Sequence, residues 1–420
     1  MRAADFAGQA IFLVMNRAAM KKAASFLGLS RSMAGMLAMV VLVGLGEKMA
    51  ERFLPIYLVA LGGGAISVGL LNGLDNLLSA LYSYPGGYLA DRLGFKKALL
   101  IFNLMAMAGF LVVILVPAWQ AVILGSILFL SWTAISLPAT MNLVAVVLPT
   151  QKRTMGVSMH SLVRRLPMAL GPVLGGLCIS LWGTQNGVRL AFGAALVLAA
   201  VGLILQQRLI VEKPAEKGKA LPAAGLFKAL PLLSPSLKRL LLADILVRFC
   251  EQIPYAFVVI WCMQRVASPV SAVQFGLLTA VEMATAMLIY VPVAHFADQS
   301  AKKPFVVGTF VFFSLFPLAL WFCQSFWPLV GAFVLRGLKE FGEPTRKALI
   351  MDLAPEDRKA ATFGLYYLLR DMVVSLAAFG GAFLWLISPA ANFLTAFACG
   401  LAGTVYFALK GRDLGGGQAR

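Results

Sequence analysis

Residues 66–91 read ISVGLLNGLDNLLSALYSYPGGYLAD, and residues 273–298 read VQFGLLTAVEMATAMLIYVPVAHFAD. When the two stretches are aligned end to end, they match at glycine, proline and acidic positions as well as at Leu and Ala. The matched pairs include Gly69 with Gly276, Pro85 with Pro292, Asp75 with Glu282 and Asp91 with Asp298. Unrelated apolar helices share Leu and Ala by chance, but they do not share these other residue types in register. The sequence therefore predicts two halves that arose by duplication.

The composition places both halves in a membrane. Of the 420 residues, 60% are hydrophobic and only 13% are charged, and the mean hydropathy is +0.85. A soluble protein carries about 25% charged residues, so the composition argues against a soluble enzyme or a nucleic-acid-binding protein. The five cysteines lie in apolar runs without a CxxC pair, which indicates buried hydrophobic residues rather than a metal site.

The chain divides into stretches that are long enough to cross a bilayer. A spanning helix needs about 20 mostly apolar residues, and Gly, Pro and basic clusters separate twelve such stretches. We predict spans at 33–60, 66–88, 98–117, 119–148, 156–182, 187–207, 238–262, 271–295, 304–323, 327–350, 360–387 and 391–410. No room remains for a large soluble domain.

The loops between these spans alternate in charge, and most of the net charge of +18 lies in every second loop and at the termini. The opposite loops carry only Arg189 and Arg265 as cations. By the positive-inside rule we expect both termini in the cytoplasm, in a multi-pass protein of a bacterial inner membrane. The predicted parts are a basic amphipathic N-terminal segment (1–31), a six-helix bundle (32–207), a cytoplasmic linker (208–236), a second six-helix bundle (237–410) and a cytoplasmic tail (411–420).

The loop after the second span reads GYLADRLGFKK over residues 87–97. It resembles the signature GxLaDrxGrkx of the major facilitator superfamily, with Phe95 in place of the usual basic residue. The resemblance extends over all twelve spans and implies an all-α membrane fold of two pseudo-symmetric six-helix bundles. It also implies a cytoplasmic gate held by the carboxylate of Asp91, with a weaker duplicate at Asp298. The residues that we assign to this gate are Gly87, Asp91, Arg92, Gly94, Lys96, Lys97 and Asp298.

The fifth span contains GPVLGG over residues 171–176. Glycine and proline together permit a kink and a close helix contact in lipid. The stretch resembles the GPxxGG core found in proton-coupled exporters of the same superfamily, although Pro167 stands where an upstream glycine is usual. The resemblance favours export over import. The residues of this helix-packing motif are Gly171, Pro172, Gly175 and Gly176.

Charged residues inside the spans are candidates for function, because each costs about 2.5–3.5 kcal/mol at the bilayer centre unless it is paired or hydrated. The first and seventh spans each carry a stripe of charge, and the superfamily resemblance implies that these stripes face each other across a central cavity. A desolvated carboxylate holds a proton that it releases when water reaches it. The candidates for transport and proton coupling are Glu47, Glu51, Arg52, Asp75, Arg248, Glu251 and Glu282. The alternative is that Asp75 or Glu282 forms a fixed ion pair, for example with Lys48 or Arg52.

Other embedded residues are candidates for a substrate cavity. Cations at this depth favour an anionic or zwitterionic solute, with structural ion pairing as the alternative. We expect Arg165 to pair with an acid in another span. We also expect Arg370 not to pair directly with Asp371, because neighbouring residues point to different sides of a helix. The cavity candidates are Arg164, Arg165, Tyr255, Arg336, Glu340 and Arg370.

These features predict a secondary transporter that works by alternating access. A Walker loop, a Cys/His metal set and a GxSxG elbow do not occur in suitable contexts, so an ATP-driven pump and a membrane hydrolase both lack their chemistry. The first hypothesis is proton-coupled export, by antiport, of an amphipathic small molecule. The second is uptake of an anionic or zwitterionic metabolite, and the third is a lipid-translocating or scaffolding protein without proton coupling. We expect a monomer in the lipid bilayer that binds a small-molecule substrate and protons, with no cofactor, no metal and no nucleic acid.

Overall fold

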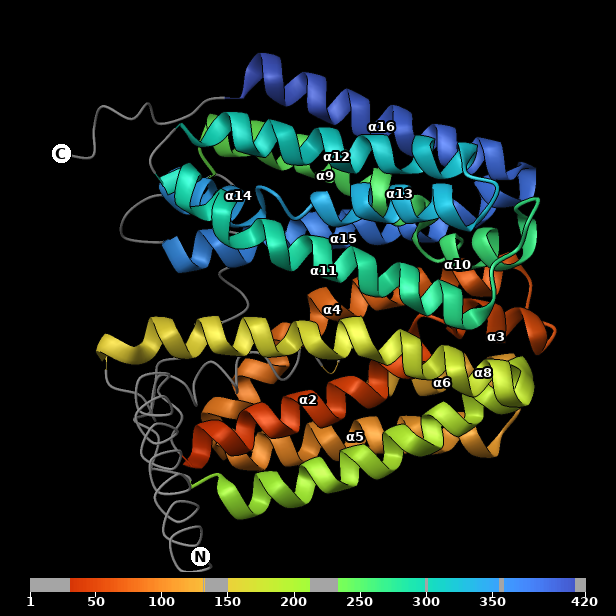
Figure 1. Ribbon diagram of the computed structural model, residues 1–420. Helices are drawn as coiled ribbons and strands as arrows, with labels where there is room; N and C mark the ends of the chain where they lie inside the picture. Colours follow the sequence, from red (N-terminus) through yellow and green to blue (C-terminus); the bar gives the residue numbers. More distant parts are fainter. Residues whose placement is uncertain are drawn as a thin grey trace, which may run out of the picture.

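The computed structural model describes residues 31–130, 132, 150–211, 233–298, 301–354 and 359–411. Every regular element in these ranges is a helix. The helices form two sets, α2 to α8 and α9 to α16, that lie side by side (Figure 1). Nearly all of the predicted N-terminal segment, most of the predicted linker and nearly all of the predicted tail lie outside the described residues. The domain boundaries therefore stay a prediction.

The first set is built around the long element α8, whose two arms reverse direction at Gly183 (Figure 1). The φ angle of 76° at this residue suits a side chain without a Cβ. The two arms correspond to the predicted spans 156–182 and 187–207, and α2 and α5 both pack against α8. The elements are α2 (Arg31–Glu51), α3 (Leu54–Ala60), α4 (Ala65–Leu93), α5 (Phe95–Leu115), α6 (Trp119–Phe129) and α8 (Thr150–Leu209).

The second set begins at Ser234, whose hydroxyl oxygen accepts a hydrogen bond of 3.2 Å from the Leu237 amide and caps the first helix. The last helix of the set, Pro389–Lys410, packs against the helices at Pro235–Tyr255 and Lys302–Phe322. The elements are α9 (Pro235–Tyr255), α10 (Val258–Ile260), the π-helical turn η3 (Trp261–Arg265), α11 (Ala272–Asp298), α12 (Lys302–Phe322), α13 (Phe326–Leu338), α14 (Glu343–Asp352), α15 (Lys359–Ile387) and α16 (Pro389–Lys410).

Seven of the described helices are long and apolar enough to cross a membrane, or eight if α9 and its bent continuation count as one span. Large apolar side chains lie uncovered on the outer faces, such as Leu288 and Trp327, each 78% exposed. A protein in water rarely leaves extensive apolar patches uncovered, so lipid is the solvent that suits these faces. The chain is a multi-pass membrane protein. The count of twelve spans stays a prediction, because the span expected at 119–148 runs past α6 into residues outside the described ranges.

Three spans are interrupted or bent where the sequence predicts continuous helices. The first span breaks after α2, and α3 starts with Pro55 in its first turn. The seventh bends by 43° after α9, next to Pro254, whose ring removes a helical hydrogen bond. The tenth breaks between α13 and α14. These findings correct the continuous helices expected over 33–60, 238–262 and 327–350.

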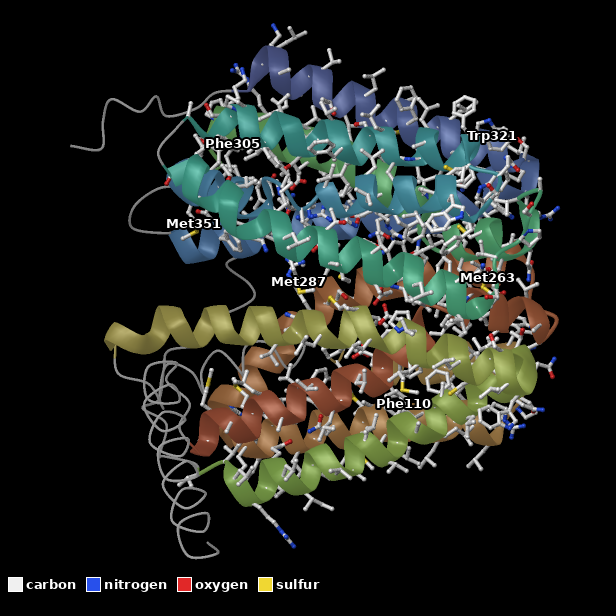
Figure 2. All side chains as sticks on the ribbon, in the orientation of Figure 1. Phe110, Met263, Met287, Phe305, Trp321 and Met351 are labelled. Atoms are coloured by element: carbon white, nitrogen blue, oxygen red, sulfur yellow. The ribbon has the colours of Figure 1, made fainter. Side chains whose placement is uncertain are left out.

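The two sets meet where α8 contacts α11 and where α4 contacts α15. A Cβ on Gly276 would lie 2.5 Å from the carbonyl oxygen of Pro172, and a Cβ on Gly176 would collide with that of Ala272. Only glycine allows this approach of two backbones. In Figure 1, α8 and α11 converge toward the turn of α8 and diverge toward the end of the bundle where α2 begins. Figure 2 shows the Met287 side chain on the side of α11 that is turned toward the first set.

Candidate functional site

A pocket lies between the two sets of helices, and the space free of protein atoms there is about 500 Å³ with its opening to solvent included. The first wall comes from α2, α3, α4 and the residue after α6, and the second wall from α9, α10, α11 and α13. Apolar residues make up more than half of the lining on these two walls. The polar lining residues are Glu51, Arg52, Asn72 and Asp75 on the first wall, and Tyr255 and Arg336 on the second.

Two of the four charged residues in this pocket are neutralised within their own set of helices. Glu51 forms an ion pair with Lys48, one helical turn earlier. Arg336 is 4% exposed, and its Nε lies 3.3 Å from Oε1 of Glu282, which is 1% exposed. Glu282 Oε1 is close enough to Arg336 for an ion pair, but neither carboxylate oxygen of Glu282 accepts a hydrogen bond from a described residue. Arg336 is thus paired before any solute enters the pocket, while Glu51 shares the single charge of Lys48 with Glu47.

The other two charged residues of the pocket are not paired. Arg52 donates from Nη1 to the Tyr255 hydroxyl at 2.9 Å and forms no ion pair with a described residue. Asp75 makes neither a hydrogen bond nor an ion pair with any residue that the structure describes. The first wall therefore presents one cation and one carboxylate without a direct ion pair to a described residue, although opposite charges nearby, such as Lys48 for Asp75 and Glu51 for Arg52, attract them at longer range.

Polar contacts also join the two sets beside the pocket. Asn72 Nδ2 donates to the backbone oxygen of Gln252 at 2.9 Å, and Asn76 Nδ2 donates to the side-chain oxygen of the same Gln252 at 3.2 Å. Arg165 Nη2 lies 3.3 Å from Glu340 Oε2, which confirms that Arg165 pairs with an acid in another span. These contacts can be exchanged for water at small cost, so they suit an interface that opens and closes.

A second pocket of about 260 Å³ adjoins the first and shares Tyr255 and Arg336 with it. Its charged lining includes Glu251 and Lys339, whose Nζ and Oε1 atoms are 2.6 Å apart. The Arg52 and Arg336 guanidinium carbons lie 5.3 Å and 5.6 Å from the centre of the Tyr255 ring, within the range of a cation–π contact. Tyr255 thus lies between the two pockets and contacts cations from both sets.

A chain of alternating charges extends from the second pocket into the second set. Glu251 lies 2.5 Å from Arg248 Nη1, and Arg248 Nη2 lies 3.5 Å from Glu343 Oε2. Glu343 in turn lies 2.7 Å from Arg346 Nη2, and Arg346 forms an ion pair with Asp244. Each buried charge has an opposite neighbour, which is the condition under which charges are tolerated in a low-dielectric interior.

Asp244, which is 1% exposed, ends this chain at a cluster of donors. The Tyr366 hydroxyl donates to Asp244 Oδ2 at 3.0 Å, and Arg370 Nη1 lies 3.5 Å from the same oxygen. Arg370 Nε also lies 2.7 Å from Asp371 Oδ1. The expectation that these neighbours do not pair is therefore wrong, because the arginine side chain is long enough to reach the carboxylate of the next residue.

The predicted candidates divide between the pocket and its surroundings. Those that line the first pocket are Glu51, Arg52, Asp75, Tyr255 and Arg336. Those that lie elsewhere are Glu47, Arg164, Arg165, Arg248, Glu251, Glu282, Glu340 and Arg370. The charged stripes of the first and seventh spans meet where Arg52 contacts Tyr255. Glu47 is 3% exposed and contacts Lys48 instead.

The expected gate lies at the end of the bundle where α4 passes into α5. Gly94 joins the two helices with a φ angle of 83°, and Lys96 Nζ donates to the Gln207 backbone oxygen at 2.8 Å. Arg92 and Lys97 are exposed. Gly87 and Asp91 lie in α4 and Asp298 ends α11, but the side chains of Asp91 and Asp298 lie outside the described part of the structure. The gate therefore stays a prediction.

The GPVLGG motif lies where α8 is packed most tightly. A Cβ on Gly171 would lie 2.7 Å from Cβ of Lys48, and one on Gly175 would collide with the Met49 carbonyl oxygen. Gly176 and Pro172 contact α11 on the other side. The motif therefore packs α8 against α2 within its own set and against α11 across the interface, so helix packing is a role that its contacts fully account for.

Several residues that complete the ion pairs were not among the predicted candidates. These are Lys48, Asp244, Lys339, Glu343 and Arg346. Opposite charges three or four residues apart on one helix were a visible sign of pairing, but contacts between helices left no such sign. In the described ranges, no group of three or more His, Cys, Asp or Glu side chains is arranged to hold a metal ion.

A helical membrane protein whose two similar halves enclose a charged pocket is a secondary transporter by architecture. The chain belongs to the Major Facilitator Superfamily, because the model of that family matches residues 36–268, more than half of the chain. The superfamily resemblance seen in the sequence is thereby confirmed.

Known proteins similar to this chain are also transporters rather than enzymes. An uncharacterized MFS-type transporter from Methanocaldococcus jannaschii is 22% identical over 362 residues, which cover 83% of this chain and 87% of the relative. The structure of the nucleoside transporter NupG gives a TM-score of 0.75 at 14% identity and covers 90% of this chain and 100% of that one. The structure of the peptide transporter POT in complex with sulfate gives a TM-score of 0.72 at 15% identity and covers 90% of this chain and 93% of that one. These structural similarities show the fold.

Proposed function

We propose that this transporter is proton-coupled, that the central pocket holds the solute and that Asp75 carries the proton. The supporting observation is that Asp75 lines the pocket without a hydrogen-bond or ion-pair partner among the described residues. A carboxylate with no fixed cation can take up and release a proton as its hydration changes. Glu282, at the equivalent position of the second half, is instead held close to Arg336 and Lys339.

The transport cycle that we propose is a rocking of the two sets of helices about the pocket. The close glycine contacts of α8 with α11, and the divergence of these helices toward the start of α2, support a state closed at one end (Figure 1). We place both termini in the cytoplasm of a bacterial cell because of the basic loops. With that orientation, the closed end faces outward and the diverging end faces inward.

Export of an amphipathic small molecule is the direction and substrate class that we propose. The apolar lining of both walls supports an amphipathic solute, and the resemblance of GPVLGG to the motif of proton-coupled exporters supports export. Uptake of an anionic or zwitterionic solute is the second candidate, favoured by Arg52 and Arg336 in the pocket lining.

Everted membrane vesicles with an inside-acid gradient test both coupling and direction. The probes are ethidium as an amphipathic cation, the dipeptide phenylalanyl-alanine as a zwitterion and benzoate as an anion. Export predicts that at least one probe dissipates the gradient with wild-type protein and fails to do so with Asp75→Asn. The matched control is Asp352→Asn, which removes a carboxylate at the end of α14, outside the pocket.

Other outcomes contradict the proposal in separate ways. If Asp75→Asn and Glu51→Gln both keep full gradient-dependent transport, the assignment of the proton site is wrong. If a probe accumulates only in right-side-out vesicles, the direction is import. If transport of every probe is independent of the gradient, the protein is not proton-coupled.

A further inference from the structure

We infer that the solute is a zwitterion with an apolar body, and that its anionic end binds Arg52 while its cationic ammonium end binds Asp75. The inference rests on the proposed proton-coupled export and narrows its amphipathic solute to a zwitterion, a charge type that the second candidate also includes. It depends on which charges of the pocket are already compensated by the protein.

Direct ion pairs leave one pocket residue of each sign without a partner. Glu51 is bound to Lys48, which also contacts Glu47, and Arg336 is bound to an acid of α11. Arg52 and Asp75 have no ion-pair partner among the described residues, and they do not pair with each other. An uncompensated charge is costly at this depth in a membrane. A zwitterion compensates both residues at once, whereas a simple anion or a simple cation leaves one of them without a counter-charge.

The surroundings of Arg52 suit a carboxylate or phosphate group. Its guanidinium carries five N–H donors in a planar fork, and the described contacts use one of them, on the Tyr255 hydroxyl. The Tyr255 ring lies 5.3 Å from the guanidinium carbon and limits its rotation. Arg52 is therefore held in place with most of its donors available to a bound anion.

The two walls differ in a way that orients the solute. Apolar side chains line both walls, but the two charges without a direct ion pair lie on the first wall, and the second presents Val258, Val259 and Phe275 opposite them. A zwitterion would direct both charged ends toward the first set of helices and lay its apolar body against the second. The pocket is lined from both walls, so a solute held there contacts the first and the second set of helices at once.

This arrangement also sets the relation between the solute and the proton. The Asp75 carboxylate cannot hold a proton and accept a salt bridge from the solute's ammonium group at the same time, so binding of the solute releases the proton. The charged and titratable groups around Asp75 are Glu51, Arg52, Tyr255 and Arg336 in the pocket lining, and Glu47 and Lys48 on α2. Competition for one carboxylate makes the coupling an exchange of one proton for one solute.

Binding to purified full-length protein in detergent tests the inference through a matched set of probes. The parent is phenylalanyl-alanine; its methyl ester lacks the anionic end, and its N-acetyl derivative lacks the ammonium end. Calorimetry should show that each derivative binds at least about tenfold more weakly than the parent, which corresponds to ~1.4 kcal/mol. Phenylalanine and its own ester and N-acetyl forms repeat the test with a shorter spacing between the charges.

Two variants assign each end of the solute to its residue. In Arg52→Gln, binding of the dipeptide should fall to the level of its methyl ester, while binding of the ester itself should change little. In Asp75→Asn, binding of the dipeptide should fall to the level of its N-acetyl form. Binding of the N-acetyl form itself should change little in this variant. This pattern is a double-mutant cycle between protein and solute. The matched control is Arg265→Gln, an exposed cation outside the pocket, which should bind the dipeptide like the wild type.

The inference is overturned if an ester or N-acetyl form binds as tightly as its parent, if neither variant changes the ranking, or if neither zwitterion binds at millimolar concentration. Size-exclusion profiles and melting temperatures show whether each variant is folded. Failure of the proposed function is distinguishable, because gradient-dependent transport is a separate measurement. If the probes and both variants bind as expected but wild-type vesicles transport the dipeptide independently of the gradient, the solute class holds and the proton coupling is rejected.

Discussion

Asp75 and Glu282 occupy the same position in the two duplicated halves, yet their surroundings are opposite. Glu282 lies 3.3 Å from Arg336 and 3.6 Å from Lys339, and it is 1% exposed. Asp75 lines the central pocket without a partner among the described residues. The duplication thus produced two embedded acids, and only one of them is neutralised by the protein.

The difference extends to the residues around the two acids. Aligning the fourth span with the tenth places Leu130 at the position of Arg336, so the first half has a leucine where the second has the cation. Both residues line the same pocket. The backbone symmetry of the halves therefore does not carry over to their charges. Among the described residues, ion pairs are concentrated in the second half, whereas the first half keeps Arg52 and Asp75 without a direct ion pair, available to a solute or a proton.

The largest effect is expected where the second half concentrates its charges. Asp244→Asn should lower the free energy of unfolding by about 3–5 kcal/mol, because Arg346 and Arg370 would remain buried without this acid. Thermal unfolding of the purified protein in detergent measures the change, with Asp352→Asn as a control outside the cluster. A loss below about 1 kcal/mol, the value typical of an exposed pair, would show that the ion pairs do not stabilise this half.

Glu282→Gln should have the next largest effect, a loss of about 3 kcal/mol in the same unfolding measurement. The variant removes the acid closest to Arg336, while Lys339 keeps its contact with Glu251. The loss should therefore be smaller than that of Asp244→Asn. Equal stability of Glu282→Gln and the wild type would remove the contrast with Asp75.

Leu130→Arg would give the first half the cation that the second half has. An arginine at this position of the pocket should pair with Asp75 and hold it ionised. Gradient-driven transport in vesicles should then fall by about tenfold or more, which corresponds to ~1.4 kcal/mol in the barrier. Leu130→Met is the control for the change of side-chain shape. If the arginine variant transports as well as the methionine variant, neutralisation of Asp75 does not limit the cycle.

Asp75→Asn should have the smallest effect on stability, within about 0.5 kcal/mol of the wild type. No ion pair or hydrogen bond to a described residue is lost in this variant. The unfolding measurement used for Glu282→Gln makes the comparison direct. A loss comparable to that of Glu282→Gln would mean that the carboxylate has a structural partner and is not free for protons or solute.

Much of the fold could be predicted, because the length of each apolar stretch and the repeated residue pattern can both be read from the sequence. The span expected at 66–88 corresponds to α4 at Ala65–Leu93, and that expected at 391–410 corresponds to α16 at Pro389–Lys410. The interruption beside Phe53 was missed although a local signal was present, because Pro55 follows two residues later and a proline marks a probable helix boundary. How far the helix bends there depends on the helices that pack against the segment, and that information is not local.

The candidate site could be predicted in its residues but not in its pairings. The energetic cost of a charge in lipid identifies Arg52 and Asp75 without any structure. Whether such a residue is paired depends on distances between helices, which is why Glu282 and Asp75 could not be told apart. The contact between Arg370 and Asp371 was missed for another reason, since helix periodicity describes where a side chain starts and not where a long one ends.

The glycine contact between α8 and α11 has a mechanical consequence. Gly176 and Gly276 face carbonyl oxygens of the opposite helix, so the surfaces that touch there are two backbones without interlocking side chains. Ridges of side chains resist sliding because rotamers must change as one helix moves past another. A contact between two backbones requires no change of rotamer. The two sets of helices can therefore rotate against each other at this contact through small angles, while side chains elsewhere keep their own partners.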